Sequence, residues 1–206
     1  MTTLTSRSRR KSDRRSQLLA VAEQLIAERG FLAVRLEDIG AAAGISGPAI
    51  YRHFTGKEAL LVELLVGIST RLLAGAQAVL ARDPDPADAL DGLIEFHLNF
   101  ALSEPNLIRI QDRDLANLPG TAQRQVRRAQ RRYVETWVGA LRSLDPTLAE
   151  DQARVMAHAA FGLLNSTPHS MKPAHRSAAP EGTRELLRSM TLAALRRGGT
   201  PASTRG

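Results

Sequence analysis

The sequence predicts an all-α fold of about nine helices, in which a small N-terminal three-helix unit precedes a larger helical domain. Apolar residues recur with the 3.6-residue period of an amphipathic helix in almost every segment. Glycine and proline separate these segments, and no stretch shows the two-residue alternation of a half-buried strand. Because 43% of the 206 residues are hydrophobic, the chain can bury a packed core.

The first helix is expected to begin after Ser12, which can cap it, and to end at Gly30. Its apolar stripe, at the spacing i, i+3, i+4, i+7 and i+8, consists of Leu18, Val21, Ala22, Leu25 and Ile26. Three further helices are predicted at about residues 37–43, 47–54 and 57–80. Gly44 separates the first two of these, and Ser46 can cap the second, where Pro48 is tolerated in the first turn.

Beyond the Pro-rich break at residues 83–86, five more helices are predicted at about 87–102, after Pro105, 119–144, 146–164 and 180–197. Asp145 is expected to cap the fourth of them, with Pro146 in its first position. The three prolines of residues 165–180 predict a loop. The expected organisation is a flexible basic arm at 1–12, a first domain at 13–58, a second at 59–197 and a disordered tail at 198–206.

The chain has no cysteine, which removes disulfides, thiolate zinc sites and cysteine nucleophiles. The polar residues 1–11 lead into no apolar h-region, and no run approaches the ~20 apolar residues of a membrane span. We therefore expect a cytoplasmic protein with no membrane partner.

Charge is unevenly distributed. Of the net charge of +7, residues 1–57 carry +5, from ten Lys and Arg against five Asp and Glu, while residues 58–206 hold eighteen against sixteen. A basic end on a nearly neutral body suits polyanion binding, although a solubilising tail has the same composition. The arm arginines could correspondingly contact phosphate or the minor groove, or be solvated.

The two short helices around Gly44 have the form of a helix-turn-helix, because glycine supplies the backbone freedom of a tight turn. The small side chains of Ala42 and Ala43 allow the two helices to approach closely. The second helix carries Tyr51, Arg52 and His53, and Lys57 lies at the start of the next helix, where its charge could meet a phosphate.

Between Arg14 and Leu61 the sequence resembles the TetR family of repressors. The matching residues are Leu19, Ala22, Gly30-Phe31, Ile39, Ala43-Gly44-Ile45-Ser46, Ile50-Tyr51, His53-Phe54 and Lys57-Glu58-Ala59-Leu60. The resemblance implies DNA contacts from Arg35, Ser46, Gly47, Pro48, Ala49, Tyr51, Arg52, His53 and Lys57. Arg35 departs from the family, which often has a capping Ser or Thr there, because a guanidinium cannot accept a hydrogen bond.

Gly47, Pro48 and Ala49 offer almost no hydrogen-bonding side chains to base edges. Sequence readout is then expected from Arg35, Arg52 and Tyr51, from contact with thymine methyl groups, or from DNA shape. Tyr51 and Lys57 are expected at phosphates. Each residue has a simpler interpretation: Tyr51 as a core aromatic, though Phe54 is the better core candidate, Lys57 as a solvated cation, and His53 as either packed or phosphate-bound.

For the second domain the resemblance implies an Ω-shaped homodimer, an inducer pocket among the middle helices and a four-helix interface from the last two helices. Small and apolar residues predict an interface at Ala157, Ala160, Leu164, Leu187 and Met190, although a tight core has the same composition. Pocket candidates are Phe96, His97, Phe100, Tyr133, Trp137, His158 and Phe161, each of which could instead be a core residue.

An arginine row at i, i+3, i+4, i+7 and i+8 comprises Arg124, Arg127, Arg128, Arg131 and Arg132. Val126, Tyr133 and Trp137 lie on the opposite side of the predicted helix, so the row is expected to be a solvated surface. The alternative is a partner for an anionic ligand, such as the phosphates of a coenzyme A thioester.

Enzyme motifs are missing: the sequence has no phosphate-binding glycine loop, no HExxH and no GxSxG, and its five histidines form no metal spacing. We expect no enzyme and no cofactor. The sequence favours a ligand-responsive repressor that binds a palindromic operator as a homodimer and is released by an apolar effector, such as an acyl-CoA or a fatty-acid-like compound. A ligand-independent architectural DNA-binding protein is the alternative, and a helical enzyme or carrier with a basic tail is a third possibility.

Overall fold

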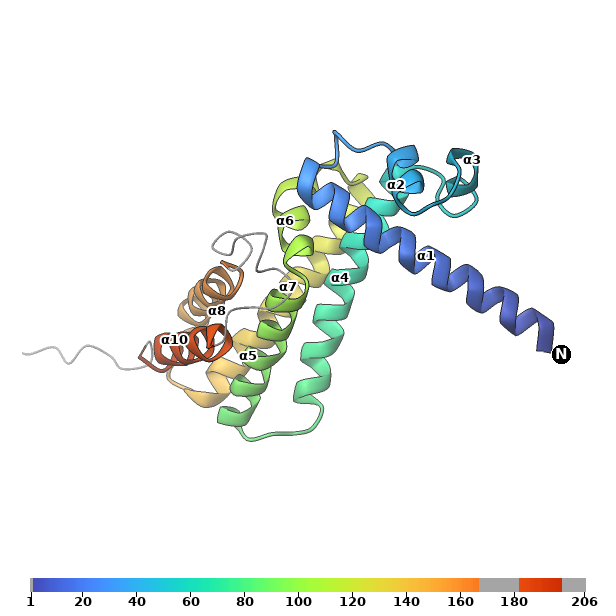
Figure 1. The fold of residues 1–206 in the computed structure, drawn as a ribbon. Helices are drawn as coiled ribbons and strands as arrows, with labels where there is room; N and C mark the ends of the chain where they lie inside the picture. The colour runs from blue at the N-terminus through green and yellow to red at the C-terminus, as the bar shows by residue number, and fades with distance from the viewer. Residues whose placement is uncertain (1, 167–181, 198–206) are drawn as a thin grey trace, which may run out of the picture. The chain divides into compact units, whose positions relative to one another are not determined.

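The computed structural model describes residues 2–166 and 182–197, and within those residues the regular structure is entirely helical (Figure 1). The described part contains nine α-helices and one 3-10 turn, which confirms the all-α prediction. The expected tail at 198–206 and nearly all of the expected loop at 165–180 lie outside the described residues.

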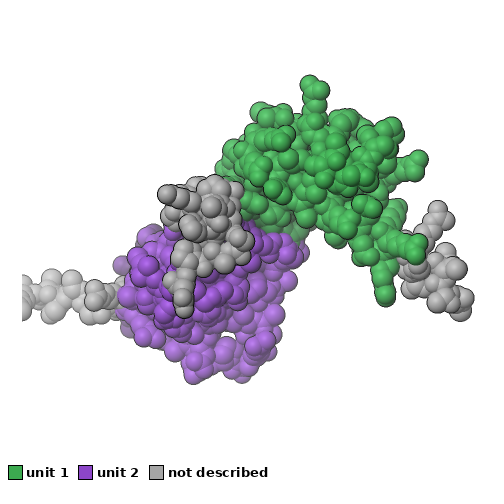
Figure 2. Space-filling view, in the orientation of Figure 1, with its two compact units in different colours: residues 1–68, 106–126 green, residues 69–105, 127–206 purple. Residues whose placement is uncertain are grey.

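The chain forms two compact units (Figure 2). The first comprises residues 1–68 and 106–126, and the second comprises residues 69–105 and 127–206. The expected division after residue 58 therefore differs from the structure, in which the first unit also contains a segment from the middle of the chain. The functions expected of the two domains, DNA binding for the first and ligand binding with dimerisation for the second, stay predictions.

The first unit is built from α1 (Thr2–Arg29), α2 (Leu36–Ala42), α3 (Gly47–Ile50), the start of α4 (Lys57–Leu80), α6 (Pro105–Asp114), the 3-10 turn η1 (Leu115–Asn117) and the start of α7 (Gly120–Leu144). Leu18, Ala22 and Ile26 of the predicted α1 stripe are buried in its core. Helix α1 begins at Thr2, so Ser12 lies inside the helix, and the expected arm is helical from residue 2. No Gly or Pro precedes Ser12 to interrupt a helix there.

Gly30 ends α1 as predicted, with a φ of +89° that favours glycine. Arg113 of α6 donates to the carbonyl oxygens of Ile26 and Ala27 at this helix end, where a positive charge is favourable. The neighbouring carboxylate of Asp114 is buried, binds the Arg113 guanidinium at 2.9 Å and accepts a long hydrogen bond from the Phe31 amide at 3.4 Å. These contacts explain why α6 belongs to the first unit.

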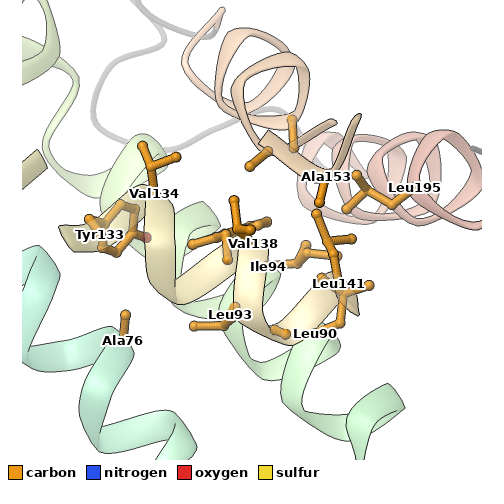
Figure 3. Close-up of a cluster of buried hydrophobic side chains, with 14 of the residues drawn as sticks. Ala76, Leu90, Leu93, Ile94, Tyr133, Val134, Val138, Leu141, Ala153 and Leu195 are labelled. Atoms are coloured by element: carbon orange, nitrogen blue, oxygen red, sulfur yellow. The ribbon is translucent and has the colours of Figure 1, made fainter. Parts of the chain in front are cut away.

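The second unit contains the rest of α4 and α7 together with α5 (Pro86–Ser103), α8 (Glu150–Leu164) and α10 (Thr183–Arg197). Asp85 caps α5 by accepting from the amides of Ala87 and Asp88 at 2.9 and 3.0 Å. The core is an apolar cluster in which Leu93, Ile94 and Val138 lie between helices α5 and α7 (Figure 3).

Two predicted boundaries differ from the structure. Helix α8 begins at Glu150 rather than at Pro146, because Asp145 instead accepts from the Thr147 amide and hydroxyl at 3.0 and 2.6 Å in a local turn. Helix α3 is a single turn that ends at Ile50, and residues 51–53 continue it as a hydrogen-bonded turn.

The sequence predicts no membrane span, but helix α4 is long and apolar enough to cross a membrane by length and composition alone. Half of its most apolar window is buried inside the fold, as in the core helix of a soluble protein, so the resemblance to a membrane span is weak.

Candidate DNA interface and effector site

The connection between α2 and α3 is the tight turn that the sequence predicts. Gly44 has a φ of +69°. The amide of Gly44 donates to the Ala41 carbonyl at 3.0 Å, and that of Ile45 donates to the Gly40 carbonyl at 2.9 Å. A side chain at Gly40 would meet Ile50 at 3.5 Å, whereas Ala42 is exposed. Gly40 thus faces α3 at ordinary contact distance, whereas the Ala42 side chain points to solvent and does not contribute to the close approach.

Ser46 occupies the predicted cap position of α3, but its hydroxyl makes no cap hydrogen bond. The geometry explains this difference, because Pro48 has no amide hydrogen and the Ala49 amide already donates to the Ser46 carbonyl at 2.9 Å. The Ser46 side chain is exposed and has no hydrogen-bond partner among the described residues. Its hydroxyl is available to a molecule outside the chain.

Arg35 stands at the cap position of α2 without capping it, as its chemistry predicts. The Asp38 carboxylate instead accepts from the Arg35 amide at 2.9 Å, which leaves the guanidinium unused. Arg52 is also exposed, and neither guanidinium has a hydrogen bond or ion pair within the described part of the chain. Two unpaired cations thus lie on the helix-turn-helix.

Tyr51 is half exposed, whereas Phe54 is buried, so the core aromatic is Phe54 as predicted. The Tyr51 hydroxyl donates to Glu37 of α2 at 2.5 Å. This hydrogen bond lowers the pKa of Glu37 and raises the pKa of Tyr51. Glu37, which the sequence analysis did not single out, therefore orients Tyr51 across the two helices.

Lys57 has an intramolecular role. Its ammonium donates to the carbonyl oxygens of Phe31, Leu32 and Val34 at 2.9, 3.3 and 2.9 Å and lies 4.5 Å from the centre of the Phe31 ring. An ammonium has three hydrogens, so these carbonyls can use all of them. A phosphate contact would require Lys57 to give up at least one of these bonds.

His53 is partly buried, and its Nδ1 has no partner among the described residues. Burial, followed by the positive charges of Lys11, Arg15 and Arg14, lowers the pKa of His53, so the ring is neutral at pH 7. Arg15 donates to the His53 carbonyl and pairs with Glu63. Phosphate attraction in this region therefore has to come from other cations.

In the second unit, six of the seven pocket candidates come together around His97. Ring centroids of Phe161, Tyr133, Phe100 and Trp137 lie 5.2, 5.8, 5.8 and 6.1 Å from that of His97. His158 is exposed and reaches the cluster through Phe161, at 6.2 Å. Phe96 is separate, because its ring packs where Gly75 of α4 leaves space.

The aromatic cluster contains a buried polar chain. His97 Nε2 lies 3.0 Å from Asn165 Oδ1, to which it donates, and its Nδ1 accepts from the Tyr133 hydroxyl at 2.9 Å. Burial lowers the pKa of His97 to about 4 and raises the pKa of Tyr133. The Trp137 indole is fully buried, and its N–H makes no hydrogen bond of ordinary geometry within the described residues, although it is near enough to the Tyr133 hydroxyl to oppose the rise in that group's pKa. The cluster thus offers neutral hydrogen-bonding groups and one unused donor.

A separate hollow of about 340 Å³ lies elsewhere in this unit. Leu90, Leu141, Leu148 and Leu195 line it, together with the charged Arg196. None of the pocket candidates borders it. Within the described residues no group of three or more His, Asp or Glu side chains could hold a metal ion.

The predicted interface residues need a correction. Ala157, Ala160, Leu164 and Leu187 are buried in the core of the single chain, so their side chains cannot form a surface between subunits. Of the five candidates only Met190 is exposed, at 46%. The large apolar residues that these two helices leave at the surface are instead Val155, Leu186 and Met190, which are 70, 58 and 46% exposed.

The family comparisons match both parts of the chain. Residues 18–64 match the bacterial regulatory proteins of the tetR family, and residues 83–174 match the tetracycline repressor-like C-terminal domain. The chain belongs to the TetR family of transcriptional regulators. Its helix-turn-helix is therefore a DNA-binding unit of that family.

Known proteins agree with this assignment. The transcriptional repressor KstR2 of Rhodococcus jostii is 38% identical over 84 residues, which is 41% of this chain and 41% of that relative. The match thus spans about two fifths of the relative's length. A TetR-family regulator from Bordetella parapertussis shares the fold at 22% identity and a TM-score of 0.78, over 88% of this chain and 93% of its own. AibR, solved with isovaleryl coenzyme A and operator DNA, shares it at 18% identity and 0.72, over 86 and 96%.

Proposed function

We propose that this TetR-family protein is a cytoplasmic, ligand-responsive repressor that binds a palindromic operator as a homodimer and is released by a mostly apolar effector. The observation that carries the proposal is the set of unpaired polar groups on the helix-turn-helix. The guanidinium groups of Arg35 and Arg52 and the hydroxyl of Ser46 are exposed and have no partners among the described residues. Groups of this kind form the hydrogen bonds to phosphates and base edges that DNA recognition requires.

The roles of these residues follow from their chemistry. Arg35 and Arg52 are assigned to base edges or phosphates, because a guanidinium can contact guanine or phosphate with two hydrogen bonds. Ser46 and Tyr51 are assigned to phosphates. Because a phenol has a single hydroxyl hydrogen, Tyr51 would have to release its hydrogen bond to Glu37 in order to donate to a phosphate. Lys57 positions residues 31–34 in front of α2 through its three carbonyl contacts. Gly47, Pro48 and Ala49 bring the backbone close to the groove without contributing polar side chains.

Dimerisation is assigned to the outward faces of α8 and α10. These helices pack on one another through their buried faces, yet Val155, Leu186 and Met190 remain exposed. Ala159 and Gly162 are also exposed on α8, one turn apart on the side of Val155, where small residues permit close helix approach. A second copy of the chain would cover this apolar surface.

The effector is assigned to the aromatic cluster around His97. Its polar atoms are neutral, and the buried Trp137 N–H makes no hydrogen bond of ordinary geometry within the described residues, so a ligand with an uncharged oxygen would complete the hydrogen bonding. The thioester carbonyl of an acyl-CoA is one such oxygen, and AibR was solved with an acyl-CoA. Because the rings fill the cluster, a ligand has to separate them, and it would favour a conformer that differs from the unliganded one.

Selection from a random duplex library tests the proposal. We expect enrichment of an inverted repeat whose half-site centres lie about 10 bp or a multiple apart, as a two-fold symmetric dimer requires. A protein that enriches no sequence would contradict the proposed specific repressor. If a sequence is enriched but no apolar ligand raises the unfolding temperature, the protein fits the alternative of a ligand-independent architectural DNA-binding protein.

A further inference from the structure

The arginine row on α7 is solvent-exposed along its whole length. Arg127, Arg128, Arg131 and Arg132 lie in the second unit, and Arg124 precedes them by one turn of the same helix. All five are exposed, and none of their guanidinium groups has a hydrogen bond or ion pair with a described residue. The row is about 12 Å long, because each residue of an α-helix adds 1.5 Å.

Four other arginines of the second unit differ from this row because each lies beside a carboxylate. Arg71 pairs with Glu104 at 2.6 Å, Arg154 with Glu150 at 2.8 Å, and Arg184 with Glu95 at 3.0 Å. Arg142, further along α7, lies 3.8 Å from Glu150. Carboxylates thus neutralise these four arginines. Arg82 and Arg196 are also exposed without a partner among the described residues, but the row places like charges three and four residues apart, where they repel.

The surface of the row has the character of a phosphate-binding surface. The apolar side of α7 is buried through Val126, Tyr133 and Trp137, so it cannot insert into a membrane as an amphipathic helix does. The one large apolar residue that α7 leaves exposed among the described residues, Leu144, lies about three turns beyond Arg132, so the row itself offers no apolar anchor to a protein partner. The hollow lined by Leu90 and Leu195, and a second one bordered by Glu135 and Glu150, contain no residue of the row.

Once a membrane, a protein partner and a pocket ligand are set aside, a polymer of phosphates is the partner whose chemistry matches this surface. Guanidinium groups bind phosphate oxygens with paired hydrogen bonds, and a polymer can bind a convex row without a pocket because it releases condensed counterions. We propose that the arginine row on α7 is a second, sequence-independent contact surface for the phosphate backbone of DNA. The inference rests on the proposed function only in that DNA is the polymer this protein meets.

The test compares two double variants that remove the same charge. Arg127→Gln with Arg131→Gln changes the row, and Arg71→Gln with Arg142→Gln changes two exposed arginines that are paired with acids. The measurement is fluorescence anisotropy of a 60-bp random-sequence duplex at a series of salt concentrations. The slope of log K against log salt should be shallower for the row variant by about 0.9 for each phosphate contact removed, so by about 1.8 in all, and unchanged for the control.

The outcomes separate the inference from the proposed function. Wild-type protein that shows no salt-dependent DNA binding would overturn both. Wild-type binding with equal slopes in the two double variants would overturn only the role of the row. Unchanged slopes together with a loss of binding to coenzyme A, or to phosphatidylserine vesicles, in the row variant alone would assign the row to that ligand and overturn the inference. Circular dichroism melting of both variants confirms that they are folded.

Discussion

The helix-turn-helix and the aromatic cluster use polar groups in opposite ways. On the helix-turn-helix, Arg35, Arg52 and Ser46 are exposed and unpaired within the described chain. In the cluster, His97 is buried and both of its ring nitrogens are hydrogen-bonded. A surface that contacts a charged polymer can keep its polar groups in water until the polymer arrives. A buried site has to satisfy most of its polar groups internally, because an unpaired buried group is costly, and the Trp137 N–H is the exception within the cluster.

Replacing one aromatic residue in each region by alanine should give the largest difference in stability between the two regions. Trp137 is fully buried, so Trp137→Ala should lower the free energy of unfolding by about 3–5 kcal/mol. Tyr51→Ala removes a half-exposed ring and should change it by only about 0.5 kcal/mol while weakening DNA binding. Urea denaturation of the two variants and anisotropy with operator DNA provide the measurements. Equal losses of stability would show that the two regions are not built differently.

The two faces of α8 and α10 should respond differently to a new charge. Leu186→Arg changes an exposed residue, so the chain should fold and light scattering should give the monomer mass. Ala160→Arg puts an unpaired charge into the core and should unfold the chain instead. A Leu186→Arg protein that remains dimeric would remove the outward face of α10 from the interface.

Acid should destabilise the second unit through His97. Its pKa in the folded state is about 4, below the usual 6.5, so the unfolded chain binds more protons between these values. The stabilisation from a neutral, buried His97 is therefore complete above pH 6.5 and is lost as the pH falls to about 4, by about 3 kcal/mol in all. Stability measured by urea denaturation across this range should be flatter in His97→Gln. An equally steep profile in that variant would assign the acid sensitivity to other groups.

Loss of Arg52 should affect operator binding alone. If the guanidinium contacts guanine with two hydrogen bonds, Arg52→Ala should lower operator affinity by about 1–3 kcal/mol and relax specificity at one position of each half-site. Its exposed side chain, without partners among the described residues, predicts no measurable change in unfolding temperature. Binding to a panel of operator variants checks the first expectation. An unchanged base preference would point to methyl contacts or DNA shape.

Lys57 should show the smallest effect on DNA binding. Lys57→Gln removes three carbonyl contacts, so the free energy of unfolding should fall by about 1 kcal/mol while the salt slope of DNA binding stays unchanged. A slope that becomes shallower by about 0.9 would instead show that Lys57 contacts a phosphate. Thermal melts and a salt titration on the same protein distinguish the two roles.

Local chemistry explains why much of the fold was predictable. Gly30 and Gly44 have positive φ angles, which a residue with a side chain adopts only with strain. The ends of α1 and α2 therefore follow from the sequence. Arginine cannot cap a helix, which predicted the behaviour of Arg35. Asp145 shows the limit of such signals, because the same residue can cap a helix or a short turn, and its contact with Thr147 decides the outcome.

The remaining differences depend on contacts between residues far apart in the chain. Periodicity identifies a small-residue face on α8 but not whether that face meets its own core or a second subunit, so Ala157 and Ala160 were assigned to the wrong side. Nothing near Arg113 in the sequence indicates that it binds the end of α1, 86 residues away. Likewise, no sequence pattern links Asn165 to His97.

Coupling between the aromatic cluster and the DNA surface is the central claim of the proposed function, and one titration tests it directly. Trp137 is the only tryptophan of the chain, so its emission reports on the cluster while the anisotropy of a labelled operator reports on DNA binding. Acyl-CoA thioesters of increasing chain length, beginning with isovaleryl-CoA, are added to the operator complex. We expect the emission to shift and the anisotropy to fall over the same ligand concentrations. Emission that shifts with a ligand while the operator remains bound at saturation would contradict the claim.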